Sequence, residues 1–114
     1  MKIMKSAVSS DFSLEEIREA VSKTAAKYGV DEVYLFGSRA RGNNEENSDF
    51  DFCIKPGRIE DLIKLGCFIN ELETELGKSV DVITESSMSE GFAQEVVRDR
   101  IAIYKCIETF SKDE

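Results

Sequence analysis

The chain has 114 residues, of which 15 are Lys or Arg and 23 are Asp or Glu, and its formal net charge is −8. This length predicts a single domain over residues 1–114, with no room for a second hydrophobic core. The negative charge argues against stable nucleic-acid binding or attachment to anionic membranes, and the longest apolar stretches are far too short to cross a bilayer.

The first predicted helix begins at Ser13. Ser13 and Glu16 match the capping-box pattern, in which each side chain accepts a hydrogen bond from the backbone of the other residue. Apolar residues then recur at helical spacing as far as Tyr28, and Gly29 is placed to end the helix. The sequence therefore predicts an amphipathic helix packed on a core.

Two predicted strands enclose a polar loop. Residues 31–36 are rich in strand-forming side chains and end at Gly37-Ser38, after which a short helix over 39–41 and a polar loop are expected. Residues 49–55 alternate strictly, which places alternate side chains on opposite faces of the strand. One face carries Phe50, Phe52 and Ile54, and the other carries Asp49, Asp51 and Cys53.

The second half of the chain predicts a long helix followed by a strand, a helix and a strand. Apolar residues from Leu62 to Leu76 form one seam, which we expect to belong to the core. Residues 79–84 predict a strand, 88–98 a helix and 101–104 a last strand. This order favours an α/β (α+β) fold, with helices packed on a mixed sheet of about four strands.

The most informative pattern is Gly37-Ser38, ten residues, and then Asp49-Phe50-Asp51. An Asp-x-Asp motif alone arises easily by chance, but the added Gly-Ser at this distance rarely does. Asp81 is predicted to lie on a neighbouring strand, to face the same side, and to act as a third metal ligand or as a general base. Three gathered carboxylates repel one another unless a cation joins them, and hard oxygen ligands favour Mg²⁺ or Mn²⁺ completed by phosphate oxygens.

The residues around Gly37 suggest how a phosphate group would be held. Gly37 lets the backbone come close to a ligand, and Ser38 offers a hydroxyl group and an N–H. Arg39 and Arg41 would neutralise charge on a triphosphate. The simpler alternatives also stand: the arginines as solvated turn residues, and the acids as exposed residues of an edge strand.

The contents of histidine and cysteine limit the chemistry. The chain has no histidine, which excludes a His-based triad or a His-ligated metal. Its three cysteines, with no Cys-x-x-Cys spacing, indicate reduced thiols. Together with the lack of a signal-peptide pattern, this predicts a cytoplasmic protein.

The segments LFGSRARG at residues 35–42 and SDFD at residues 48–51 resemble the signature of the minimal nucleotidyltransferases (MNT) of the DNA polymerase beta superfamily. The resemblance covers about residues 13–104 and implies a nucleotidyltransferase fold. Residues 80–82 and 97–104 fall where that family has its third acid and its closing strand. Phe50 and Phe52 depart from the pattern, because aliphatic residues are more usual there.

The resemblance also implies roles for the site residues. Gly37 and Ser38 would hold the triphosphate, Asp49 and Asp51 would bind magnesium, and Asp81 would help to activate an acceptor hydroxyl.

Small members of the family resemble the antitoxin half of HEPN–MNT toxin–antitoxin pairs, which attach AMP from ATP to a tyrosine of the HEPN toxin. The expected function is therefore a metal-dependent protein adenylyltransferase that acts as an antitoxin on a HEPN-type partner, with a homo-oligomeric state left open. Two alternatives remain, namely an inactive module that neutralises its partner by contact, and transfer to a small molecule, which normally needs an added helical domain.

Overall fold

A computed structural model describes residues 12–45, 48–85 and 90–106, with the side chains of residues 90, 92, 93 and 95 excepted. Helices and strands follow one another along the chain in the predicted order. They are α2 (Leu14–Tyr28), β1 (Glu32–Phe36), α3 (Ser38–Arg41), β2 (Phe50–Lys55), α4 (Leu62–Leu76), β3 (Val80–Thr84), α5 (Glu90–Asp99) and β4 (Ile101–Lys105). The predicted start of the last helix at Met88 lies outside the described residues.

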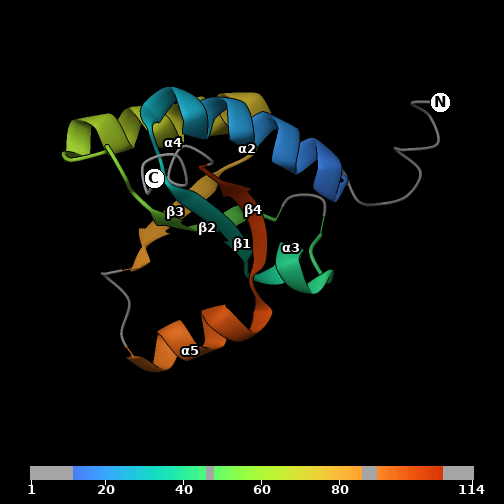
Figure 1. Ribbon diagram of the computed structural model, residues 1–114. Coiled ribbons are helices and arrows are strands. Elements are labelled where there is room, and N and C mark those ends of the chain that lie inside the picture. Colours follow the sequence, from blue (N-terminus) through green and yellow to red (C-terminus); the bar gives the residue numbers. More distant parts are fainter. Residues whose placement is uncertain (1–11, 46–47, 86–89, 107–114) are drawn as a thin grey trace.

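The four strands form one mixed sheet in the order β3-β2-β1-β4 (Figure 1). Strand β1 runs antiparallel to both β2 and β4, whereas β2 and β3 run parallel. The connection between β2 and β3 is α4, as expected for a parallel pair, which needs a long crossover. The predicted α+β class with a four-stranded mixed sheet is confirmed.

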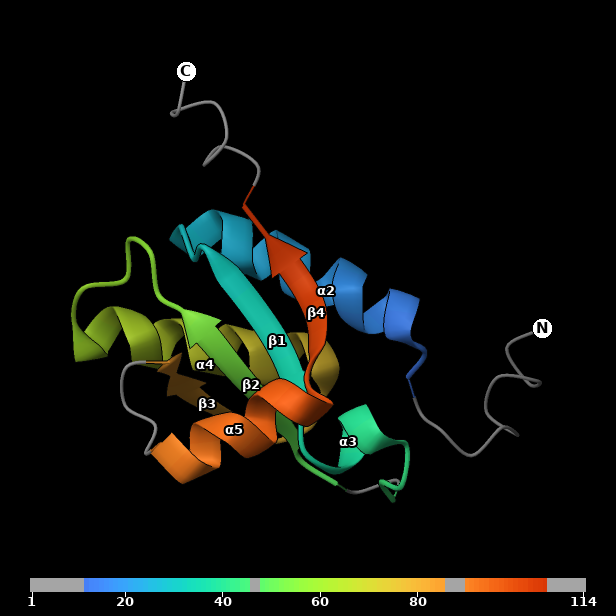
Figure 2. The same cartoon turned by 60° about the horizontal axis from the view of Figure 1, so that its bottom comes forward.

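The two faces of the sheet are covered by different helices. Helices α2 and α4 lie on one face and α5 lies on the other (Figures 1 and 2). The predicted apolar set of β2, Phe50, Phe52 and Ile54, is fully buried on the α2/α4 side. Cys53 is buried on the α5 side. The alternation of β2 is thus confirmed, and Asp51, the acid of this strand, belongs to the face that α5 covers.

The ends of the two long helices follow local rules. Ser13 and Glu16 form the capping box at the start of α2, and Gly29 ends that helix with a left-handed φ of 74°. The side chain of Asp61 caps α4 by accepting a hydrogen bond from the Lys64 N–H at 2.7 Å. Each such cap contributes about 1 kcal/mol to helix stability.

The expected seam of α4 reaches the core only in part. Phe68, Leu72 and Leu76 are buried, whereas Leu62 is 82% exposed, so its assignment to the core is wrong. The first turn of α4 lies beside Pro56 and Thr84, where the ends of β2 and β3 leave a pocket instead of a packed surface. A helical period alone does not show where the supporting sheet ends.

None of the helices in the described ranges is both long and apolar enough to span a membrane. All three cysteines are free, with Cys53 buried, Cys67 exposed and Cys106 half-buried. Burial raises the pKa of the Cys53 thiol to about 11, so this thiol stays protonated and packs as a small apolar group.

Candidate active site

Three carboxylates lie at one end of the sheet. Asp51 is the second residue of β2, and the parallel register pairs it with Asp81 of β3. Paired residues of neighbouring strands point to the same face, so both carboxylates are on the α5 side. Asp49 stands two positions before Asp51, and both Asp49 and Asp81 are exposed. The structure thus brings the predicted third acid beside the other two.

Asp51 interacts electrostatically with both other acids of this group. Its pKa is raised above the usual value of 3.8, first because the side chain is partly buried and then because Asp81 and Asp49 are negative. Arg41 acts in the opposite direction and lowers this pKa. The ionised carboxylates therefore destabilise one another in the free protein, and a positive ligand would relieve that repulsion.

The turn at Gly37 faces the Asp51 carboxylate. Gly37 joins β1 to α3 with a φ of 78° and a ψ of −158°, a conformation that is essentially restricted to glycine. A Cβ atom at this position would overlap the Oδ2 atom of Asp51. Two independent reasons therefore require glycine here, and the result is backbone in direct contact with an acidic group.

The predicted short helix is present as α3, directly after this turn. Its first residue, Ser38, is half-buried. The N–H groups of Ala40 and Arg41 both donate to the carbonyl oxygen of Gly37 at 3.1 Å. These bonds close the first turn of α3, which directly follows the end of β1.

Arg41 lies beside the acids but is half exposed. Its Nη1 atom is 3.7 Å from Oδ2 of Asp99, the last residue of α5. An exposed ion pair of this length contributes little stability, so Arg41 can exchange Asp99 for a bound anion at low cost. The pairing with Asp99 was not predicted, because an acid at the end of a helix carries no sequence signal for such a contact.

Arg39 has a different environment from Arg41. Its side chain is buried, and its Nε and Nη2 atoms donate to the carbonyl oxygen of Ser48 at 3.2 and 2.8 Å. Its guanidinium group also lies 4.1 Å from the centre of the Phe50 ring. Contact between Arg39 and a triphosphate stays a prediction, because these bonds direct the guanidinium toward the protein.

The donor chemistry of the acids suits a hard divalent cation. Within the described ranges, no three acid or cysteine side chains are gathered closely enough to enclose a metal ion by themselves. Mg²⁺ needs only one or two carboxylates when substrate phosphates and water complete its shell. Asp49 and Asp51 would supply such ligands, and the negative charges of Asp81 and Asp49 already act on Asp51 there.

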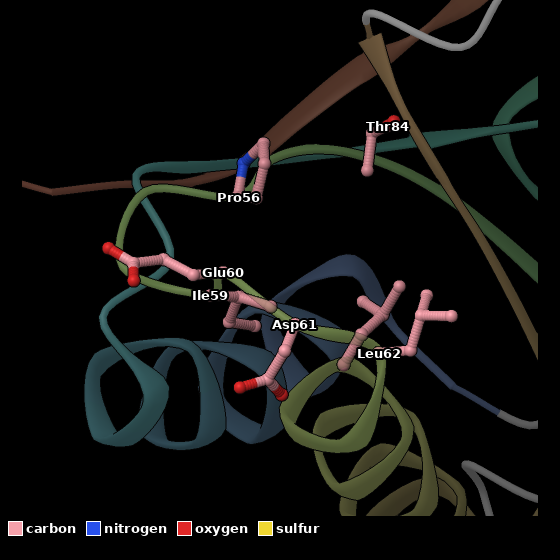
Figure 3. A pocket seen from close by; sticks show the side chains of 7 residues that line it. Pro56, Ile59, Glu60, Asp61, Leu62 and Thr84 are labelled. Atoms are coloured by element: carbon pink, nitrogen blue, oxygen red, sulfur yellow. The ribbon is translucent and has the colours of Figure 1, made fainter.

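A separate pocket of about 220 Å³ lies at the opposite ends of β2 and β3 (Figure 3). It is lined by Pro56, Ile59, Glu60, Asp61, Leu62, Leu65 and Thr84. None of these residues is cationic, and the Asp61 carboxylate already caps α4. The pocket does not offer the chemistry that a triphosphate requires, so the candidate site is the acidic end of the sheet.

Comparison with known proteins agrees with this geometry. The family model for the nucleotidyltransferase domain matches residues 14–104. The chain belongs to this nucleotidyltransferase family. The matched range contains the Gly37 turn and all three acids.

Two relatives match this nucleotidyltransferase over most of their length. This chain is 33% identical to "Protein adenylyltransferase MntA" of Thermococcus cleftensis over 95 residues, which cover 80% of this chain and 96% of the relative. It is 35% identical to "Putative protein adenylyltransferase MJ0435" of Methanocaldococcus jannaschii over 89 residues, which cover 78% and 90%.

Solved structures share the fold of this nucleotidyltransferase. A "putative minimal nucleotidyltransferase" superposes with a TM-score of 0.68 at 33% identity and covers 81% of this chain and 97% of that chain. A toxin–antitoxin complex with AMP-PNP superposes with a TM-score of 0.66 at 22% identity, covers 89% and 80%, and shows the likeness of fold alone.

Proposed function

We propose that this nucleotidyltransferase transfers AMP from ATP to a hydroxyl group of a HEPN-type toxin and thereby acts as its antitoxin. The observation that carries the proposal is the pairing of Asp51 with Asp81 beside the Gly37 turn. The names of the two relatives support protein adenylylation as the reaction. The fold shared with a toxin–antitoxin complex supports the choice of partner.

ATP would bind with its triphosphate at the Gly37 turn. Backbone at Gly37 and the hydroxyl of Ser38 would contact phosphate oxygens, and Arg41 would leave Asp99 to pair with them. Asp49 and Asp51 would hold Mg²⁺, which supplies positive charge to the α-phosphate and to the pyrophosphate leaving group. The mutual repulsion of the carboxylates supports this role, since cation binding removes it.

The transfer step forms one bond and breaks another. The acceptor oxygen attacks the α-phosphorus in line, the bond to the β-phosphate oxygen breaks, and pyrophosphate leaves. Asp81 would take the proton of the acceptor hydroxyl, because it is exposed at the rim of the site and open to an incoming side chain. Arg41 would stabilise the charge that develops on the leaving group.

The acceptor hydroxyl would be a tyrosine of the toxin. The described residues form only the sheet and its covering helices, with no added lobe to hold a small acceptor. The net charge of −8 favours a partner with a basic surface. Reduced cysteines and ATP as substrate both fit a cytoplasmic site of action.

Transfer of labelled AMP tests the proposal. The protein, a co-expressed HEPN-type toxin, α-labelled ATP and Mg²⁺ should give a labelled toxin, and peptide mass spectrometry should place the AMP on tyrosine. The double variant D49N/D51N and the single variant D81N should lose the label.

The double variant E19Q/E60Q, which removes two exposed acids far from the site, serves as the control for net charge and should keep the label. Undiminished labelling by D49N/D51N would refute the site. Protection from the toxin by that variant, without labelling by any form, would show that the protein acts by contact alone.

A further inference from the structure

Arg39 is a charged side chain in a buried position. It is 9% exposed, and besides it only Thr24 is a buried polar residue in the described part of the chain. Removing a guanidinium group from water costs several kcal/mol unless hydrogen bonds and packing offset the loss. The fold therefore accepts the desolvation cost of the Arg39 guanidinium, and the contacts of this group show what offsets that cost.

These contacts reach the segment that carries the acids. The two hydrogen bonds from Arg39 end on the carbonyl oxygen of Ser48, the residue directly before Asp49. The guanidinium plane lies against Phe50, the residue between Asp49 and Asp51. Arg39 thus contacts the chain on both sides of Asp49.

The segment that Arg39 contacts also makes three further contacts. Ser48 closes a small loop with Glu45, since its N–H donates to the Glu45 carbonyl at 3.0 Å and its Oγ accepts from the Glu45 N–H at 2.8 Å. The N–H of Phe50 donates to the carbonyl oxygen of Ser79 at 3.0 Å, two residues before Asp81. The Phe50 ring stacks on Phe52 in the core, with centroids 5.8 Å apart.

We infer that Arg39 is a positioning residue that fixes Asp49 and Asp51 against the phosphate-binding turn, an inference that rests on the proposed function. Arg39 follows Gly37 and Ser38 in α3, so one side chain connects the turn to the strand of the acids. Loss of this connection would remove the contacts that tie the residues on both sides of Asp49 to α3, and errors of about 1 Å in such sites cost up to about a hundredfold in rate.

The test replaces Arg39 with lysine and with methionine. Lysine keeps the charge but lacks the planar group that donates twice to Ser48 and stacks on Phe50, and methionine removes the charge as well. The control is Arg18, whose Nε and Nη2 atoms donate to the carbonyl oxygen of Ala102 at 3.4 and 3.1 Å. Arg18 belongs to α2, which covers the face of the sheet opposite to α5 and the acids (Figure 2). R18K and R18M make the same chemical change away from the site.

We expect R39K and R39M to raise the Mg²⁺ concentration for half-maximal AMP transfer about tenfold to a hundredfold, as loss of supporting contacts does at metal sites. The KM for ATP at saturating Mg²⁺ should change much less, and the R18 variants should match the wild type in both. A raised KM for ATP with an unchanged Mg²⁺ requirement would overturn the inference and make Arg39 a phosphate ligand.

Hydrogen exchange tests the positioning role without catalysis. The amides of Ser48 and Phe50, which donate to the carbonyl oxygens of Glu45 and Ser79, should exchange at least about tenfold faster in the R39 variants than in the wild type and the R18 variants. Equal exchange would overturn the inference even where the variants melt at a lower temperature. Faster exchange with no AMP transfer by the wild type would instead refute the proposed function and leave the structural role of Arg39 intact.

Discussion

Replacing Asp51 with asparagine should stabilise the metal-free protein while it abolishes transfer. Asp51 is half-buried and paired with Asp81 on the adjacent strand, at a strand spacing of about 4.8 Å. Two unit charges at that distance repel by about 1 kcal/mol in water and about 3.5 kcal/mol at the effective dielectric of a protein surface. Because Asp81 is exposed, screening favours the lower figure, so we expect a gain of about 1–2 kcal/mol.

The effect should depend on pH with a defined sign. The pKa of Asp51 is raised in the folded state above 3.8, so the folded protein binds the proton more tightly than the unfolded chain does. Stability is therefore lost as the pH rises through the pKa of the folded state. The asparagine variant has no such loss, and its advantage should vanish below about pH 3.5 and be complete near neutral pH.

Thermal melting tests both the gain in stability of D51N and its dependence on pH. D51N should melt about 4–8 °C above the wild type at pH 7 without divalent ions, and Mg²⁺ should raise the melting temperature of the wild type but not of the variant. E19Q, which removes one exposed charge from α2, should melt like the wild type. A variant that melts at or below the wild type at every pH would refute the idea that the acids repel one another in the free protein.

Two further substitutions test the Gly37 turn and the exchange of Arg41 between Asp99 and the triphosphate. G37A should lose about 2–4 kcal/mol of unfolding free energy and nearly all transfer, since a Cβ there is strained at a φ of 78° and overlaps Asp51. G42A is the control, because its φ is 80° but nothing lies within 4 Å of its Cβ, and it should lose only about 1–2 kcal/mol. Equal losses of unfolding free energy on denaturant titration would contradict the overlap. D99N should lower the KM for ATP about twofold to fivefold because it frees Arg41 for the triphosphate, and a raised KM would mean that Asp99 orients Arg41 instead.

The sequence predicts the fold well where local signals and packing agree. The capping box at Ser13, the glycine at position 29 and the alternation from Phe50 to Ile54 each have a local physical cause, and each appears in the structure. The face that carries Asp51 follows from the same alternation. For this reason the side of the sheet that holds the acids was predictable before the strand order was known.

The features that were not predictable depend on contacts between distant segments. The period of α4 includes Leu62, but only the ends of β2 and β3 decide that this residue is exposed. An arginine after a Gly-Ser turn suggests a phosphate ligand, and the burial of Arg39 depends on Phe50, which lies eleven positions further along the chain. The contact between Arg41 and Asp99 depends in the same way on where α5 ends.

The segment from Gly37 to Asp51 is where the chain departs from what stability alone would select. It combines a turn that only glycine tolerates, a buried guanidinium and a half-buried carboxylate among other acids. Each feature is costly in a free protein, and proteins retain such costs mainly at functional sites. A module that acted only by contact would need none of them at the end of its sheet, whereas an enzyme that positions a cation and a triphosphate needs all three. The distribution of strain and charge therefore favours catalysis over contact as the reason for this site.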